Sequence, residues 1–152
     1  MDRFTERRVI VTGAGSGIGQ ATVARLLYEG AIVVGCDVST GGLAHTAAAA
    51  AEAGTGKRLT TAVLDVASED AVTAAVDAAL VELGGLEVLI NAAAIQPCAH
   101  THEHTLADCN ATVAVNLTDT FLMTRQALPA LADCVLSQSR RRATKGRNSS
   151  SS

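Results

Sequence analysis

Residues 9–19 read VIVTGAGSGIG, an apolar run that breaks into four alternating glycines and then passes into a helical pattern. The first three residues are β-branched and apolar, which suits a strand that is buried on both faces. Residues 20–29 continue with apolar side chains at helical spacing. The stretch therefore predicts a strand, a tight glycine turn and a helix.

The glycine turn is a candidate anion-binding site. Glycine lets the backbone N–H groups at a helix start approach an anion, and the helix dipole adds a favourable potential there. The spacing fits T-G-x-x-x-G-x-G, with Gly13, Gly17 and Gly19 in register, and not the commoner G-x-G-x-x-G. The pyrophosphate of a dinucleotide is the usual occupant of such a turn. A purely structural turn is the alternative.

The composition indicates one globular domain. The chain has 152 residues, of which 48% are apolar, so it can bury a core. Its start is charged and lacks the apolar run of a signal peptide, and no later run approaches the length of a membrane span. The four cysteines show no C-x-x-C spacing. We therefore expect a soluble cytoplasmic protein with reduced, mostly buried thiols and no membrane contact.

Charge divides the chain near Leu136. The first 136 residues hold 7 basic and 15 acidic residues, whereas residues 137–152 hold five basic residues and no acidic one. The second segment is rich in serine and arginine, a composition typical of disorder. We predict a globular domain over 1–136 and a disordered basic tail over 137–152. A frameshifted or alternatively spliced C-terminus accounts best for this tail, and a nucleic-acid-binding tail is the less favoured alternative.

Strands and helices alternate along the chain. The remaining predicted strands lie at 31–36, 58–64 and 86–90, and the helices between them lie at 40–53 and 68–83. This order favours an α/β fold, a partial Rossmann fold with a doubly wound parallel sheet and flanking helices. Right-handed crossovers give the strand order 3-2-1-4, and ligands bind such sheets at the carboxyl ends of the strands. Those ends fall at Gly13, Asp37, Asp65 and Asn91.

Asp37 ends the second predicted strand, 18 residues after Gly19. An acid at this place in a βαβ unit accepts hydrogen bonds from the adenosine ribose and repels a 2′-phosphate. No lysine or arginine stands at Ser16 or Val38 to hold such a phosphate. The sequence therefore favours NAD over NADP, with a simple turn residue as the alternative for Asp37.

In their order these motifs resemble the short-chain dehydrogenase/reductase (SDR) family, from about residue 7 to residue 133. The matching segments are the glycine turn, Asp37, the pair Asp65-Val66, and Asn91-Ala92-Ala93-Ala94, which varies the family's N-N-A-G segment. The resemblance implies that Asp65 and Val66 contact the adenine and that residues 91–93 line the cofactor. The expected cofactor-binding residues are Gly13, Ser16, Gly17, Ile18, Gly19, Asp37, Asp65, Val66, Asn91, Ala92 and Ala93.

Asn116 is a fifth match, within a helical stretch predicted at 106–131. Asn is a poor residue for a helix interior, so we expect a buried polar role, with an exposed helical Asn as the alternative. The resemblance implies that Asn116 belongs to the catalytic tetrad of the family, where its backbone binds a water of the proton relay.

The segment 98–104 holds one cysteine and three of the four histidines. Such side chains could bind zinc or nickel, but alternate residues of an extended segment point to opposite sides. We therefore predict no metal site, and interpret the segment as a solvated loop that borders the substrate mouth.

The remaining catalytic groups of the family do not appear in the sequence. Family members carry a serine and a Y-x-x-x-K pair, in which the lysine lowers the tyrosine pKa so that the phenolate can take the proton of the substrate hydroxyl. By family spacing this tyrosine would lie beyond Ser152, and the single tyrosine of the chain is Tyr28, in the first helix.

Two functional interpretations remain open. The first follows from the resemblance: residues 1–136 form an incomplete NAD-binding Rossmann-type domain, the cofactor-binding part of an oxidoreductase that transfers a hydride between NAD and a secondary alcohol or ketone, and the chain is inactive alone. Alternatively it is a non-catalytic NAD-binding or interaction module. Since the fourth strand would lack a neighbour on one side, we also predict self-association or aggregation.

Overall fold

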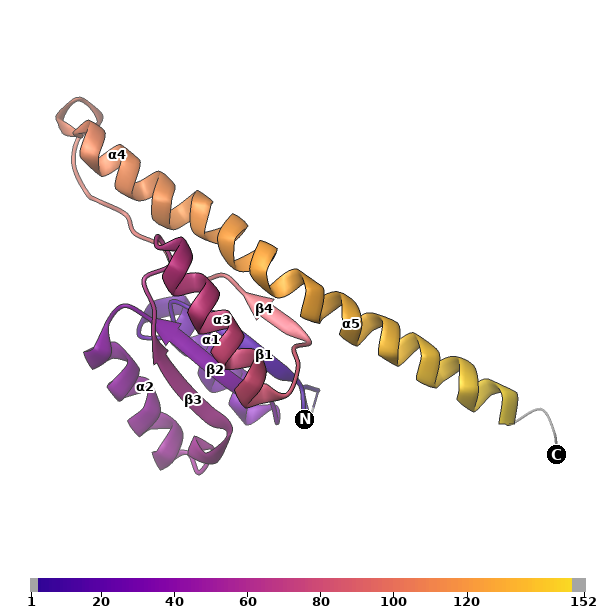
Figure 1. Cartoon of the computed structure of the whole chain (residues 1–152). Coiled ribbons are helices and arrows are strands. Elements are labelled where there is room, and N and C mark those ends of the chain that lie inside the picture. Colours follow the sequence, from indigo (N-terminus) through magenta and orange to yellow (C-terminus); the bar gives the residue numbers. More distant parts are fainter. Residues whose placement is uncertain (1–2, 149–152) are drawn as a thin grey trace.

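The computed structural model describes residues 3–148, and it describes side chains through Leu136. The chain forms a sheet with helices on both faces (Figure 1). The strands are β1 (Arg8–Thr12), β2 (Ile32–Asp37), β3 (Leu59–Val63) and β4 (Val88–Ile90). The α-helices are α1 (Gly17–Tyr28), α2 (Thr40–Glu52), α3 (Glu69–Leu83), α4 (Leu106–Val113) and α5 (Asp119–Asn148). Short turns of other helix types are η1 (Gly56–Arg58), η2 (Thr101–Glu103) and η3 (Ala114–Thr118).

The sheet has the order β3-β2-β1-β4, and each neighbouring pair is parallel. This confirms the predicted fold class and strand order. At the centre, Val9 of β1 pairs with Val33 of β2 on one side and with Val88 of β4 on the other. All carboxyl ends therefore lie on one edge of the sheet, as the sequence predicted.

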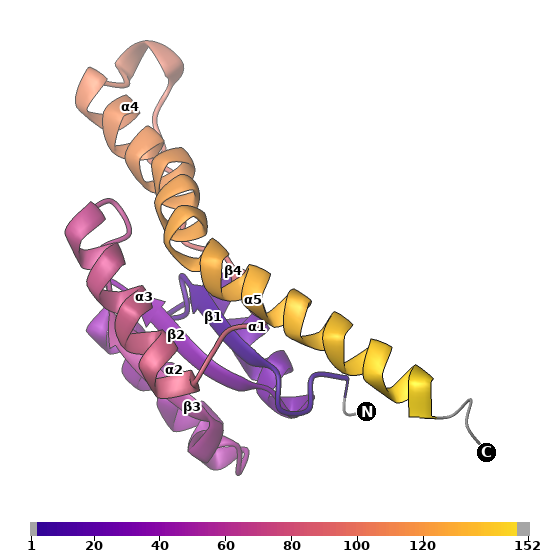
Figure 2. The same cartoon turned by 45° about the vertical axis from the view of Figure 1, so that its right-hand side comes forward.

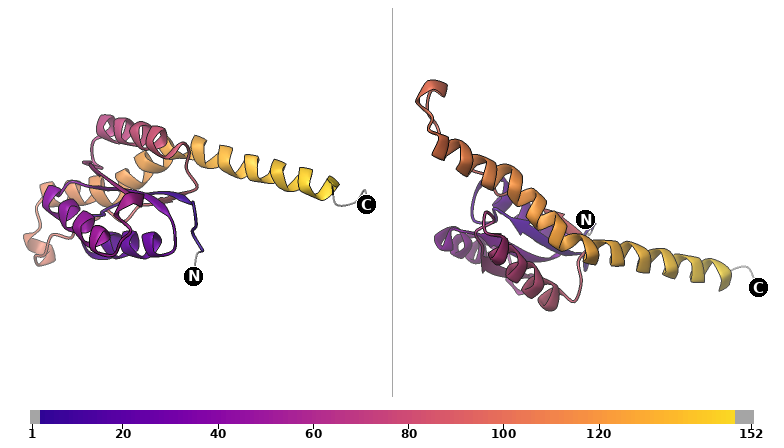
Figure 3. Two further views of the ribbon diagram at one scale, coloured as in Figure 1. Left: turned by 90° about the horizontal axis from the view of Figure 1, so that it is seen from below. Right: turned by 45° about the horizontal axis from the view of Figure 1, so that its top comes forward.

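Alternate residues of β1 enter two separate cores. Val9 and Val11 pack with Val23 of α1 and Leu43 of α2. Ile10 packs on the opposite face with buried residues of α3 and α5, among them Val72, Val76, Leu122 and Met123. Figure 3 shows α3 on one side of the strands and α1 and α2 on the other. Burial on both faces explains why β1 is uniformly apolar.

Helix α3 illustrates how local sequence sets the boundaries. The Ser68 hydroxyl accepts a hydrogen bond from the N–H of Ala71, and acidic residues at 69 and 70 occupy the positive end of the helix. Gly84 ends the helix with a φ of +67°, a conformation that glycine adopts readily. The cap and the glycine stop explain why the observed helix matches the one predicted at 68–83.

The predicted helix at 106–131 is longer and less regular than expected. It comprises α4, the π-helical η3 and α5, which runs on to Asn148 and extends beyond the sheet (Figure 2). The backbone of residues 137–148 is thus helical where the sequence led us to expect disorder. Alanine, arginine, lysine and glutamine are good helix formers, and extending an existing helix needs no new nucleus. The prediction for residues 149–152 lies outside the described residues.

Two further expectations can be compared with the structure. Among the cysteines only Cys36 is buried, while Cys98 and Cys109 are exposed and Cys134 is half-buried, so the expectation of mostly buried thiols is wrong. Burial, together with the nearby Asp37 carboxylate, raises the pKa of the Cys36 thiol to about 11. Over residues 3–148, no helix combines the length and apolar character that crossing a bilayer requires.

Glu29 fastens the N-terminal segment to the end of α1. Its side chain is fully buried and pairs with the guanidinium groups of Arg3 and Arg25, whose side chains are exposed. The Arg25 Nε lies 2.7 Å from Glu29 Oε1, and the Phe4 N–H donates to the Glu29 carbonyl oxygen. Hydrogen bonding from Arg3, and then from Arg25, lowers the Glu29 pKa from its ordinary 4.5 to about 2.

Replacing Glu29 by glutamine is expected to lower the melting temperature at pH 7 by roughly 5 °C, because two guanidinium groups lose their counter-charge. Since the folded-state pKa lies below the unfolded one, the stabilisation is complete above about pH 4.5 and disappears as the pH falls towards 2. Thermal melts of both proteins between pH 7 and 2 should therefore converge. A difference in melting temperature between wild type and Glu29→Gln that stays constant from pH 7 to pH 2 would contradict a stabilising role for the ionised Glu29 carboxylate. Glu52→Gln, at the exposed end of α2, is the matched control.

Candidate functional site

At two positions, the turn between β1 and the start of α1 is too tight for a side chain. Gly13 has a φ of +68°, and a Cβ there would lie 2.6 Å from the carbonyl oxygen of Ala92. A Cβ at Gly19 would lie 2.0 Å from the carbonyl oxygen of Gly13. Glycine alone fits these positions without a backbone shift. The turn thereby brings the start of α1 to the carboxyl edge of the sheet.

The N-terminus of α1 lacks a side-chain cap. Ser16 occupies the capping position, but among the described residues its side chain makes no capping hydrogen bond, and the first turn contains no acid. Ile18, in that turn, is 81% exposed. Uncapped N–H groups and the positive end of the helix dipole favour an anion at this point.

Asp37 lies beside the turn at the end of β2. Its Oδ2 accepts a hydrogen bond from the Gly15 N–H at 2.8 Å, and its Oδ1 accepts one from the Ser39 N–H at 2.8 Å. These bonds fix the direction of the carboxylate. Each oxygen retains a lone pair that can accept a hydrogen bond from a ligand hydroxyl.

Thr12 joins the ends of β1 and β4. Its hydroxyl accepts hydrogen bonds from the N–H groups of Ala92 and Ala93, each at 3.1 Å, and the residue is fully buried. These bonds hold the segment after β4 against the glycine turn. Thr12 was not among the predicted site residues, and its place in the glycine motif is the sequence signal that could have indicated this role.

The ends of β3 and β4 complete the edge. The Asp65 carboxylate accepts a hydrogen bond from the Ala67 N–H at 2.9 Å, and Val66 is buried next to it. The Asn91 Nδ2 lies 3.4 Å from the hydroxyl of Thr124, a long hydrogen bond. The Asn91 Oδ1 is buried and has no partner within the part of the chain that the structure describes. Asn91 thus points towards α5, while Asp65 and Val66 remain at the edge.

These segments enclose a hollow of about 400 Å³ at the carboxyl edge. Its lining comprises Gly13, Ser16, Gly17, Ile18, Asp37, Val38, Leu64, Asp65, Val66, Ala92, Ala93, Ala94, Ile95 and Val115. Every predicted cofactor-binding residue is present except Gly19, which is buried under the turn, and Asn91. The volume falls within the range of roughly 300–1,000 Å³ that is usual for small-molecule sites.

Asn116 lies in the π-helical segment η3 and contacts the rim of the hollow. Its side-chain amide donates to the carbonyl oxygen of Ile95 and accepts from the Ile95 N–H, both at 2.9 Å. The residue is exposed, so the expected burial is wrong, although its polar atoms are engaged. The paired bonds fix the chain after β4, and π-helical turns frequently occur at functional sites.

A second, open hollow of about 640 Å³ adjoins the first and shares Ala94 and Ile95 with it. Thr101 and His104 from the histidine-containing segment line it, together with residues of α4. The rings of His100 and His102 stack with their centres 5.9 Å apart. Within residues 3–148, no group of three histidine, cysteine or acidic side chains is arranged to hold a metal ion.

Comparison with known proteins matches this architecture to one family. A family model described as short chain dehydrogenase matches residues 7–141. The chain is 36% identical over 132 residues to the levodione reductase of Leifsonia aquatica, covering 86% of this chain and 49% of that protein. It is 40% identical over 128 residues to the cis-4-hydroxycyclohexanecarboxylate dehydrogenase of Sinomonas cyclohexanicum, covering 84% and 50%. The chain therefore spans about half the length of these relatives.

A solved structure supports the same match. The short chain dehydrogenase/reductase of Burkholderia phymatum, in complex with NAD, superposes with a TM-score of 0.78 at 29% identity. The superposition covers 86% of this chain and 46% of that one. The shared region thus includes most of the fold described above.

Proposed function

This chain belongs to the short-chain dehydrogenase family, and from that premise we propose that the hollow at the carboxyl edge of its sheet binds NAD. Members of this family use a nicotinamide dinucleotide. The main support is the glycine turn. Its backbone is packed so tightly that a Cβ at Gly13 or Gly19 would collide with backbone atoms, and it exposes the uncapped N–H groups at the start of α1. In this proposal those N–H groups bind the pyrophosphate.

The adenosine half is assigned to the ends of β2 and β3. Asp37 has free lone pairs for the ribose hydroxyls, while Leu64 and Val66 provide an apolar wall beside Asp65 for the adenine. A carboxylate at this point repels a 2′-phosphate, and neither Ser16 nor Val38 supplies a positive charge. We therefore propose a preference for NAD over NADP.

The nicotinamide half is assigned to residues 92–95, which Thr12 and Asn116 hold in place. When bound, the nicotinamide would supply the acceptor for a hydride from a secondary alcohol, or the donor to a ketone. The adjoining open hollow, shared through Ala94 and Ile95, is the proposed side of substrate approach. Asn116 is the member of the catalytic tetrad that this sequence contains.

We propose further that the chain in its present form binds the cofactor without turning substrate over. The phenolate that takes the hydroxyl proton needs a Y-x-x-x-K pair, which these 152 residues do not contain. Tyr28 is no substitute, because it lies at the far end of α1 and is 68% exposed. The alternative function, a non-catalytic NAD-binding module, has the same binding site and the same missing groups.

Calorimetry and a turnover assay test these proposals separately. Titration with NAD should show one site with a Kd between roughly 1 μM and 1 mM, the range of typical Michaelis constants. Incubation with NAD and a set of secondary alcohols should give no NADH absorbance above the protein-free rate. Absence of NAD binding would contradict the proposed site, whereas steady NADH formation would contradict only the proposed inactivity.

A cytoplasmic location of the protein stays a prediction.

Self-association is expected from an edge strand and from an exposed apolar face of a helix. β4 is an edge strand, and on α5 Phe121 and Leu128 are 59% and 55% exposed, with Leu117 of η3 67% exposed nearby. Covering such surfaces with a second copy removes apolar area from water. Sedimentation velocity should show dimers or larger species that decrease in Phe121→Ser with Leu128→Ser. A wild-type protein that sediments as a monomer at all concentrations would contradict this expectation.

A further inference from the structure

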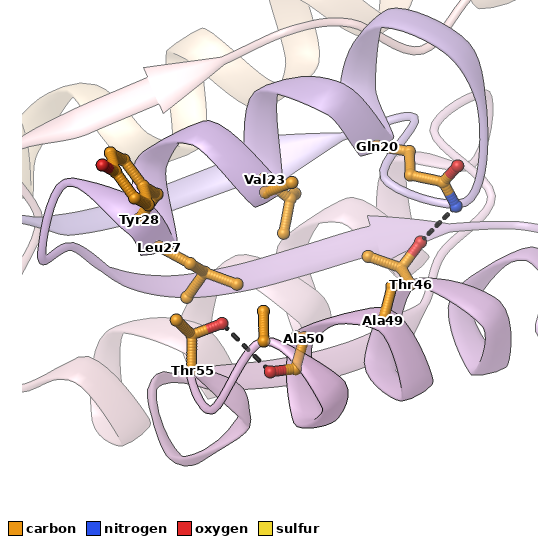
Figure 4. A pocket seen from close by; sticks show the side chains of 10 residues that line it. Gln20, Val23, Leu27, Tyr28, Thr46, Ala49, Ala50 and Thr55 are labelled. Atoms are coloured by element: carbon orange, nitrogen blue, oxygen red, sulfur yellow. Dashed lines mark hydrogen bonds between the residues drawn. The ribbon is translucent and has the colours of Figure 1, made fainter.

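Thr46 is a buried polar residue in the middle of α2, behind the glycine turn. It is 4% exposed and lines a small pocket of about 110 Å³ between α1 and α2. Figure 4 shows Thr46 at one end of this pocket, joined to Gln20 of α1 by a hydrogen bond. Neither residue lines the proposed NAD site.

The two side chains hold consecutive carbonyl groups of the glycine turn. The Thr46 hydroxyl lies 2.8 Å from the carbonyl oxygen of Ala14, closer than the 3.1 Å to Gly42 in its own helix. The Gln20 Nε2 donates to Thr46 Oγ1 at 2.8 Å and reaches the carbonyl oxygen of Gly15 at 3.3 Å. Helices α1 and α2 thus both contact the turn through this pair.

The close approach of α2 is built into its sequence. A Cβ at Gly42 would lie 2.6 Å from the carbonyl oxygen of Gly15, so glycine is required for the observed spacing. This spacing places Thr46, one turn further along α2, within hydrogen-bonding distance of Ala14. A threonine in a helix interior commonly bonds to its own helix, and here the turn provides the nearer acceptor.

Because a peptide group is planar, a side chain that holds its carbonyl oxygen also fixes the direction of its N–H. Each peptide group is planar and trans, so fixing a carbonyl also fixes the N–H of the next residue, which points the opposite way. Thr46 therefore orients the Gly15 N–H, which donates to Asp37 Oδ2. Gln20 orients the Ser16 N–H at the start of α1, where Ser16 lines the hollow.

We propose that Thr46 is a positioning residue: its hydroxyl holds Gln20, which aligns the Ser16 N–H for the diphosphate of the dinucleotide, while the Gly15 N–H stays on the Asp37 carboxylate. This inference rests on the proposed NAD site. Removing the hydroxyl leaves Gln20 with only its longer contact to the Gly15 carbonyl, which permits the peptide group between Gly15 and Ser16 to rotate. The peptide group between Ala14 and Gly15 loses the Thr46 donor but stays held by Asp37. The effect should therefore fall on ligands that carry phosphates and spare the adenosine alone.

The test compares Thr46→Val, which keeps the shape but loses the hydroxyl, with Thr46→Ser, which keeps the hydroxyl. Calorimetry with NAD and with adenosine should show that Thr46→Val weakens NAD binding about tenfold and adenosine binding less than about twofold. Thr46→Ser should restore NAD affinity to within about threefold of wild type. Gln20→Met, which removes the amide but keeps the length, should act in the same direction as Thr46→Val.

A measurement without NAD keeps the inference separate from the proposed function. In ¹⁵N–¹H spectra of the free proteins, the Gly15 and Ser16 amide signals should shift in Thr46→Val and return in Thr46→Ser. If wild type binds NAD and Thr46→Val binds it equally well, the positioning role is wrong and the site stands. If wild type binds no NAD, the proposed function fails. Unchanged amide signals in folded Thr46→Val overturn the inference in either case.

Discussion

Replacing Gly19 by alanine is expected to weaken NAD binding by more than about 100-fold. The added methyl carbon would lie 2.0 Å from the carbonyl oxygen of Gly13, a distance that non-bonded atoms do not reach. Both partners belong to the backbone of the same turn, so the turn must open to relieve the contact. Opening it moves the N–H groups that are proposed to hold the pyrophosphate.

The same substitution at Gly41 is the matched control. Gly41 lies in the first turn of α2, and a Cβ there would meet nothing within 4 Å. Gly41→Ala should bind NAD like wild type and be more stable by up to about 1 kcal/mol, because alanine is the better helix former. Calorimetric titrations and thermal melts of both variants measure the contrast. Equal NAD affinities for Gly19→Ala and Gly41→Ala would show that the turn does not form the site.

Changing Asp37 to asparagine should alter the choice between cofactors. The carboxylate has both oxygens available as acceptors, whereas an amide has one, and the substitution also removes the negative charge. We expect NAD affinity to fall by about tenfold or more and NADP affinity to fall less or to rise. The ratio of the two affinities should therefore decrease by at least about tenfold.

Calorimetry with both cofactors at one ionic strength measures this ratio. Glu52→Gln removes one negative charge at an exposed position on α2 and should leave the ratio unchanged. If Asp37→Asn also leaves the ratio unchanged, then Asp37 does not face the ribose and the assignment of the adenosine half is wrong. A lower ratio that persists at high salt would favour loss of hydrogen bonds over loss of long-range repulsion.

The strand order and the edge that carries the site could be predicted because their signals are local. Continuous apolar runs identify strands that are buried on two faces. A capping residue such as Ser68 marks the start of a helix, and a glycine such as Gly84 marks its end. Once the βαβ order is set, right-handed crossovers leave little choice of topology. The residues that end the strands must then meet, and most of the predicted set does line one hollow.

What could not be predicted depends on contacts between distant segments. Thr46 bonds to Ala14 across 32 positions, and this contact depends on how closely α2 approaches the turn. Asn116 was expected to be buried because asparagine is unfavourable in a helix, but its amide is satisfied by Ile95 at an exposed position. Likewise, the charge and serine content of residues 137–148 indicated disorder, although several of them are good helix formers and α5 continues through them. The helix propensity of a residue is a weak guide where contacts with a neighbouring element determine the local structure.

Occupation of the hollow at the carboxyl edge by NAD can be tested by an NMR titration. In ¹⁵N–¹H spectra of the full chain, added NAD should shift a connected set of amide signals at residues 13–18, 37–38, 64–66 and 92–95. The signals of the outer pocket near Ala49, Ala53 and Thr55 should move little. No saturable shifts at millimolar NAD, or shifts centred on that outer pocket, would contradict the claim.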